Sequence, residues 1–185
     1  QEDFLRLEAT IDLDEEPTPF TAVTGHEVKK AFTRNEVKYD RLADHLGALP
    51  VIIITPDDNS LINGGSETRR RFLDSLMAQM DRRYLDHLQQ YNRILQQRNA
   101  LLKKFAEQGG YNPTLLESYD EQLTHHGDAI HATRKEIIAA MQEPVARYYK
   151  AISGDKEQIA LSYLSPVNEQ PMEQLLAANK ELDRL

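Results

Sequence analysis

The longest stretch without proline or glycine runs from Ser66 to Gln108, and it constrains the fold more than any other feature of the sequence. Within it, apolar or long side chains recur at residues 73, 77, 80, 84, 88, 91, 95, 98, 102 and 105. The mean step is about 3.6 residues, the period of an α-helix with one buried face. The stretch therefore predicts a helix about 60 Å long, with one break at the charged cluster Asp81–Arg83.

A second long helix is predicted directly after the first. Gly109–Gly110 ends the first helix, Asn112 is a favourable N-cap and Pro113 suits the first helical position. We expect the second helix to run to about Gln142, because Pro144 should end or kink it. Two helices joined by a glycine turn predict an antiparallel hairpin, called the arm below. After the arm, alternation at residues 159–163 predicts a short strand, and residues 171–185 are predicted to form a last helix.

The first 55 residues have the shorter period of β-structure. Residues 5–13 alternate between apolar and polar, which indicates a strand with one buried face. The elements predicted after it are a turn over Asp14–Pro19, a strand over Phe20–Thr24, a turn at Gly25–His26, one or two strands over Val28–Tyr39 with a turn at Thr33–Glu36, a short helix over Asp40–Leu46 stopped by Gly47, and a doubly buried strand over Leu49–Thr55. The prediction is an α+β protein, with a β-rich antiparallel sheet domain over residues 1–62 and a mainly helical arm domain over residues 63–185.

Composition excludes several classes of protein. The longest apolar run, Ala48–Ile54, has seven residues, whereas a membrane-spanning helix needs about 20. The absence of cysteine removes disulfides, a thiolate nucleophile and cysteine zinc sites, and it agrees with a cytoplasmic location. The chain begins with Gln1, so we expect a processed chain or an excised piece.

Charge is distributed unevenly. The net charge is −8, yet Arg69–Lys104 holds nine basic residues against three aspartates, a local charge of +6. Such an island suits phosphates or an acidic partner. The alternative, favoured by spacing alone, is a solvated helix face.

Two segments are candidate ligand sites. Pro56, Asp57 and Asp58 directly follow the predicted buried strand, where ligands and metals are commonly held, although an aspartate there can equally cap a short helix. Gly64–Gly65 opens a helix that carries Arg69, Arg70 and Arg71, a generic anion-binding arrangement. The segment lacks the Lys-Ser/Thr pair of a P-loop, and we expect at least one of these arginines to form a structural salt bridge instead.

The histidines of the second helix are not predicted to bind metal. His125, His126, Asp128 and His131 lie close together, but their spacing matches no established zinc motif. We expect them to be solvated or to pack within the arm. The sequence contains neither a Gly-x-Ser-x-Gly nucleophile elbow nor a cysteine, so no catalytic residue is predicted.

The segment from Leu49 to Lys103 resembles the RecF family of bacterial recombination-repair ATPases. The resemblance rests on a strand ending in Pro-Asp-Asp, a Gly-x-x-x-RRRFLD step, Tyr-Asn-Arg and Gln-Arg-Asn-Ala-Leu-Leu-Lys, in that order. It extends through Asp120-x-Gln122-Leu123, Gly127–Arg134 and Ser162–Tyr163 to nearly the whole chain. The resemblance implies part of an ABC-type ATPase head, related to SMC proteins, that carries a helical arm.

The resemblance also implies what the chain lacks and what the full-length protein binds. The family's P-loop should precede Gln1, and its signature and Walker B acids should follow Leu185, so this piece should hydrolyse no ATP and hold no cofactor. The full-length protein should bind ATP and Mg²⁺, dimerise with ATP, bind gapped duplex DNA, and act with RecO and RecR to load RecA.

By the same analogy, Pro56, Asp57 and Asp58 should lie near the nucleotide. Arg69, Arg70 and Arg71 should relay nucleotide state to the arm or contact DNA phosphate. The alternative is a stand-alone helical-hairpin adaptor, which should have a closed core, whereas an excised piece should leave strand edges and apolar faces uncovered. A histidine-metal hydrolase is a distant third reading.

Overall fold

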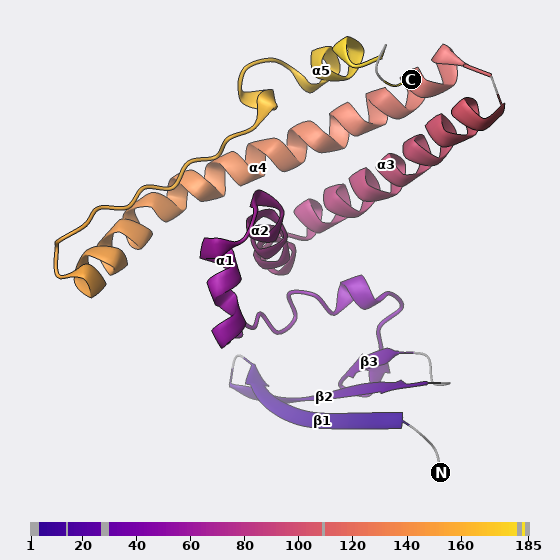
Figure 1. Cartoon of the computed structure of the whole chain (residues 1–185). Coiled ribbons are helices and arrows are strands. Elements are labelled where there is room, and N and C mark those ends of the chain that lie inside the picture. The colour runs from indigo at the N-terminus through magenta and orange to yellow at the C-terminus, as the bar shows by residue number, and fades with distance from the viewer. Residues whose placement is uncertain (1–3, 14, 27–29, 109, 181–182, 184–185) are drawn as a thin grey trace. The chain divides into compact units, whose positions relative to one another are not determined.

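The chain divides into two compact units, Gln1–Asp81 and Arg82–Leu185, shown in a computed structural model (Figure 1). The structure describes residues 4–13, 15–26, 30–108, 110–180 and 183. α1 and α2 fall in the first unit by this division, and the domain boundary expected between residues 62 and 63 stays a prediction. None of the helices in the described ranges is both long enough and apolar enough to cross a bilayer.

The first unit contains an antiparallel sheet with strand order β1-β2-β3-β4. The strands are β1 (Phe4–Leu13), β2 (Glu16–Gly25), β3 (Ala31–Arg34) and β4 (Val37–Lys38). β1 and β2 form a hairpin in which Leu13 pairs with Glu16 and Phe4 with Gly25. The strand over residues 5–13 and the two strands between Val28 and Tyr39 are confirmed, although Val28 itself lies outside the described residues.

The turn predicted over Asp14–Pro19 is too long. Asp14 lies outside the described residues, and β2 already begins at Glu16, so it includes Pro17 and Pro19. The sheet tolerates both prolines because β3 pairs only with Phe20–Val23, which leaves this end of β2 with one neighbouring strand.

The buried strand predicted over Leu49–Thr55 is wrong for this structure. Residues 51–55 have no regular secondary structure, and the exposed fraction of Ile54 reaches 87%. The main-chain N–H of Val51 donates to Oε1 of Gln79 instead of to a strand. β-Branched residues favour a sheet only where neighbouring strands cover them, and no described residue supplies such strands. Leu5 and Leu7 of β1 are likewise exposed, so the buried face expected for that strand is incomplete.

Short helices connect the sheet to a longer one in the same unit. They are the 3₁₀ helices η1 (Leu42–Asp44) and η2 (Pro56–Asn59), then α1 (Ser60–Asn63) and α2 (Ser66–Met80). The helix expected over Asp40–Leu46 is therefore reduced to one 3₁₀ turn. Gly47, with φ of +84°, follows it and lies against α2: a Cβ there would be 2.5 Å from the carbonyl oxygen of Gln79.

The second unit is the predicted arm. It consists of α3 (Arg82–Gln108), α4 (Pro113–Ser153), η3 (Pro166–Asn168) and α5 (Met172–Ala178), and α3 lies beside the first part of α4 (Figure 1). The predicted break at Asp81–Arg83 is confirmed, because α2 ends at Met80 and α3 begins at Arg82. The predicted cap is confirmed as well, since Asn112 Oδ1 accepts a hydrogen bond of 3.1 Å from the N–H of Leu115.

The predicted end of the second helix near Gln142 is wrong, because α4 continues through Pro144 to Ser153. Proline costs a helix about 3 kcal/mol, and tertiary contacts offset this cost. The chain returns along α4 (Figure 1), where Gln142 exchanges two hydrogen bonds with the main chain of Leu161. Residues 159–163 have no regular secondary structure, so the strand predicted there is wrong for the described chain. The last helix is shorter than expected: α5 ends at Ala178.

Candidate functional site

The loop after residue 55 places the two predicted aspartates in different roles. Oδ2 of Asp58 accepts a hydrogen bond of 2.6 Å from the N–H of Thr55 and so caps η2, with Pro56 at its first position. Asp57 is exposed, and its carboxylate has no partner recorded within the described residues. Only Asp57 is therefore available to a ligand without loss of a cap.

The three arginines of α2 also differ from one another. Nη1 of Arg69 donates to the carbonyl oxygens of Leu61 and Gly64, at 3.1 and 2.8 Å, and so closes the C-terminal end of α1. Nη1 of Arg70 donates to Oγ of Ser66 at 3.0 Å, one turn earlier on α2. Arg71 is exposed, with no hydrogen bond or ion pair recorded in the described part of the chain. Arg71 is thus the arginine best placed to accept a phosphate.

The basic residues of Arg69–Lys104 do not form one uniform surface. Arg98 is buried, and Arg82 and Lys103 pair with acids one turn away on α3. Such local ion pairs are typical of a solvated helix face, which is the alternative to a phosphate-binding surface.

The arm contains a buried ion triad that sequence analysis did not find. Arg98 on α3 is only 5% exposed. Its Nε lies 2.7 Å from Oδ1 of Asp120 on α4, and its Nη2 lies 2.6 Å from Oδ2 of Asp183 near the C-terminus. Burial alone lowers the pKa of Arg98, but the hydrogen bonds that Arg98 donates to Asp183 and Asp120 outweigh it, so the pKa is raised overall. The 3.6 period marked Arg98 as a seam position without revealing its partners.

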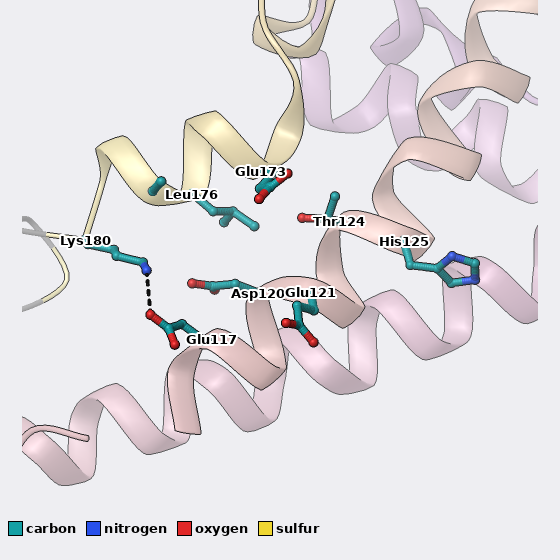
Figure 2. A pocket seen from close by; sticks show the side chains of 9 residues that line it. Glu117, Asp120, Glu121, Thr124, His125, Glu173, Leu176 and Lys180 are labelled. Atoms are coloured by element: carbon teal, nitrogen blue, oxygen red, sulfur yellow. Dashed lines mark hydrogen bonds and ion pairs between the residues drawn. The ribbon is translucent and has the colours of Figure 1, made fainter. Parts of the chain in front are cut away.

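A cavity of about 510 Å³ lies beside this triad, between α4 and the α5 region (Figure 2). Its polar lining is mostly acidic: Glu117, Asp120 and Glu121 from α4 and Glu173 from α5. Nζ of Lys180 is the cationic group in the lining, and it lies 3.2 Å from Oε1 of Glu117. A cavity with this excess of carboxylates suits a cationic group and disfavours phosphate.

Three histidines meet on the arm, one of which sequence analysis missed. His87 on α3 lies beside His125 and His126 on α4, and one ligand atom from each side chain lies within 4.8 Å of the others. Nδ1 of His87 and Nδ1 of His126 are 2.9 Å apart. Burial lowers the pKa of His126, and the neighbouring His125 and His87 lower it further. His131, which is near His125 and His126 in the sequence, packs against Tyr163 within the arm, with ring centroids 5.3 Å apart.

No protein-family model matches the chain, but its sequence is similar to those of several RecF proteins. It is 37% identical over 183 residues to the DNA replication and repair protein RecF of Flavobacterium johnsoniae, which covers 99% of this chain and 51% of that protein. Its identity to RecF of Parabacteroides distasonis is 38% over 157 residues, covering 85% of this chain and 42% of that protein. The chain spans about half the length of the curated relatives that it matches.

Solved structures agree with the sequence relatives. The fold matches a structure described as the recombination mediator protein RecF-ATPrS in the RecFOR pathway, with a TM-score of 0.90 and 26% identity, over 99% of this chain and 52% of that one. A second structure, described as RecF-ATP, matches with a TM-score of 0.86 and 25% identity, again over 99% of this chain. The α+β fold class, with an antiparallel sheet and long helices, is confirmed. Along nearly its whole length, in sequence and in fold, the chain is similar to about half of a RecF protein.

Proposed function

We propose that this chain is the sheet-and-arm part of a RecF-like protein of DNA replication and recombination repair, and that it hydrolyses no ATP by itself. The observation that carries the proposal is the match along 99% of the chain both to a RecF sequence and to a RecF structure described with ATP. The chain contains no Gly-x-x-x-x-Gly-Lys-Ser/Thr motif. The phosphate cradle and the acids that hold Mg²⁺ therefore belong to the other half of the full-length protein.

The full-length protein would bind ATP with Mg²⁺, dimerise around it, and bind duplex DNA beside a single-stranded gap. It would act there with RecO and RecR to load RecA. The solved relative described as a recombination mediator in the RecFOR pathway supports this role.

The exposed apolar segment favours the hypothesis that the chain is part of a larger ATPase head over the hypothesis that it is a stand-alone adaptor. Val51, Ile52, Ile53 and Ile54 are between 57% and 87% exposed. A self-sufficient adaptor would bury such a run, because leaving four aliphatic side chains in water forgoes about 1.5–3 kcal/mol for each. The remaining half of a RecF-like protein offers a surface to cover them.

The loop geometry divides the proposed roles among residues. Asp57, free of a cap, would face the nucleotide's metal ion or the attacking water, whereas Asp58 would hold the loop's shape. Arg71, free of local hydrogen bonds in the described chain, would contact DNA phosphate, whereas Arg69 would hold α1.

Nucleotide turnover tests the role of Asp57. In the full-length protein, Asp57→Asn should slow ATP hydrolysis, because it removes the charge that faces the metal or water. Asp58→Asn is the matched control, since an asparagine keeps the cap and should leave turnover near that of the unchanged protein. Equal rates for Asp57→Asn and the unchanged protein would remove Asp57 from the site.

The salt dependence of DNA binding tests Arg71. Arg71→Ala in the full-length protein should reduce the slope of log K against log salt by about 0.9, the value of one lost phosphate contact. Arg69→Ala should lower stability and leave the slope unchanged. An unaltered slope for Arg71→Ala would assign Arg71 to the solvated surface.

A further inference from the structure

Three imidazole rings converge on one side of the arm from positions far apart in the sequence. His87 comes from α3, and His125 and His126 come from α4, 38 and 39 residues later. The ring centroids are 5.7 Å apart for His87–His125, 5.2 Å for His87–His126 and 4.9 Å for His125–His126. Each ring therefore contacts both of the others.

We propose that His87, His125 and His126 form a binding site for a divalent transition-metal ion, which links α3 to α4. Zinc lies about 2.0–2.1 Å from a histidine nitrogen, so two ligating nitrogens in a tetrahedral site are about 3.3 Å apart. Here, one nitrogen from each ring already lies within 4.8 Å of the other two. The exposed side chain of His125 is free to make the remaining adjustment by rotation about its two torsions.

The surroundings of the three rings favour the binding of a cation. Neutral imidazole is the form that binds metal. His125 also lines the cavity whose other walls carry Glu117, Glu121 and Glu173 (Figure 2). These carboxylates make the local potential negative and so raise the local concentration of cations.

The donor set defines which ions the site takes. Three imidazoles suit Zn²⁺, Co²⁺, Ni²⁺ and Cu²⁺, whereas Mg²⁺ and Ca²⁺ require oxygen ligands. The site is therefore distinct from the Mg²⁺–nucleotide site of the proposed function, and it does not depend on that function. Three protein ligands leave the fourth tetrahedral position open to water.

The physical consequence is a cross-link between the two long helices of the arm. An ion that binds only the folded arm stabilises it by an amount that grows with the logarithm of free ion concentration. With metal bound, the parts of α3 and α4 around the three histidines should unfold locally as one unit, and less often than in the metal-free arm.

Metal titration of the full-length protein tests the site. Nucleotide-free protein, stripped with a chelator, is titrated with ZnCl₂ alone by calorimetry and with CoCl₂ alone by visible absorption. We expect one zinc ion bound at micromolar concentration and the intense visible bands of four-coordinate Co²⁺. His87→Gln, His125→Gln and His126→Gln should each weaken zinc binding at least about tenfold, because each removes a ligand.

The controls separate metal binding from folding. His26→Gln, an exposed histidine of the other unit, should leave zinc affinity unchanged. His125 is exposed, so its substitution should preserve the fold even if His87→Gln or His126→Gln disturbs helix packing. Hydrogen exchange provides a second measurement: zinc should slow exchange in the peptides that contain His87 and His126, and not in β1. Absence of zinc binding at micromolar concentration, or equal affinity for His125→Gln and the unchanged protein, would overturn the proposal.

Discussion

Replacement of Arg98 by methionine should destabilise the arm strongly. The Arg98 side chain is 7% exposed, and its guanidinium contacts Asp120 at 2.7 Å and Asp183 at 2.6 Å. Removal of one member of a buried ion pair costs about 3–5 kcal/mol, because the partner is left as an uncompensated buried charge. Asp183 has a side chain that is 21% exposed and can recover water, whereas that of Asp120 is 12% exposed. We therefore expect a cost of about 3 kcal/mol, near the low end of that range.

Hydrogen exchange measured by mass spectrometry gives this cost locally, without requiring the full-length protein to unfold in one step. A loss of about 3 kcal/mol should speed exchange of the protected amides near Arg98 and Asp120 about 150-fold. Lys103→Met on the same helix is the matched control. Its pair with Glu107, at 3.9 Å, has side chains that are 79% and 63% exposed, so the change should be smaller than about 1 kcal/mol.

A double variant makes the reasoning refutable. Arg98→Met combined with Asp120→Leu removes the two most buried charges of the triad and should recover most of the lost protection, because apolar residues of similar volume replace a buried pair at little cost. A double variant as unstable as the sum of its two single variants would show that the two side chains are not coupled. Exchange in Arg98→Met no faster than in Lys103→Met would show that the triad is not a buried network.

Two further predictions concern the first unit. Gly47→Ala should destabilise it by more than about 1–2 kcal/mol, because a φ of +84° strains an alanine and its Cβ would lie 2.5 Å from the carbonyl oxygen of Gln79. The control is Gly65→Ala, where a Cβ has open space. A change in thermal midpoint no larger for Gly47→Ala than for Gly65→Ala would contradict the prediction. His45 stacks on Phe32 with ring centroids 4.4 Å apart, and burial lowers the pKa of His45 below the ordinary 6.5. The unfolded chain therefore binds the proton more tightly than the folded one, and the stability of the folded unit should fall as pH drops through 6.5. His45→Phe should flatten the pH dependence of the thermal midpoint between about pH 8 and pH 5.5, and an unchanged dependence would count against this assignment.

Local patterns predicted the elements whose causes are local. The break before Arg82, the cap at Asn112 and the strand over residues 5–13 each depend on a few neighbouring residues, and the structure confirms them. Pro144 shows the limit of such reasoning. The helix continues through this proline, and beside it Gln142 bonds a segment 19 residues away, a contact that no local rule reveals.

The candidate sites were harder to predict because their members meet only in the folded chain. The spacing of His125 and His126 within α4 matched no zinc motif and predicted no metal site, whereas in the folded chain His87 joins them from another helix. Arg98 likewise finds Asp183 at a separation of 85 residues. For Asp57 and Asp58 the residue types were informative, yet only the hydrogen bond from Thr55 distinguished the capping residue from the free one.

The segment 51–54 shows a pattern whose cause lies beyond the chain's own contacts. Four consecutive β-branched residues are typical of a doubly buried strand, but here they are exposed, and the chain spans about half of its RecF relatives. We therefore expect the other half of the full-length protein to cover this segment and to supply its strand partners. Slow hydrogen exchange of residues 51–54 in the full-length protein, against fast exchange in this 185-residue chain, would establish that dependence. Fast exchange in both would mean that the apolar run serves a different contact.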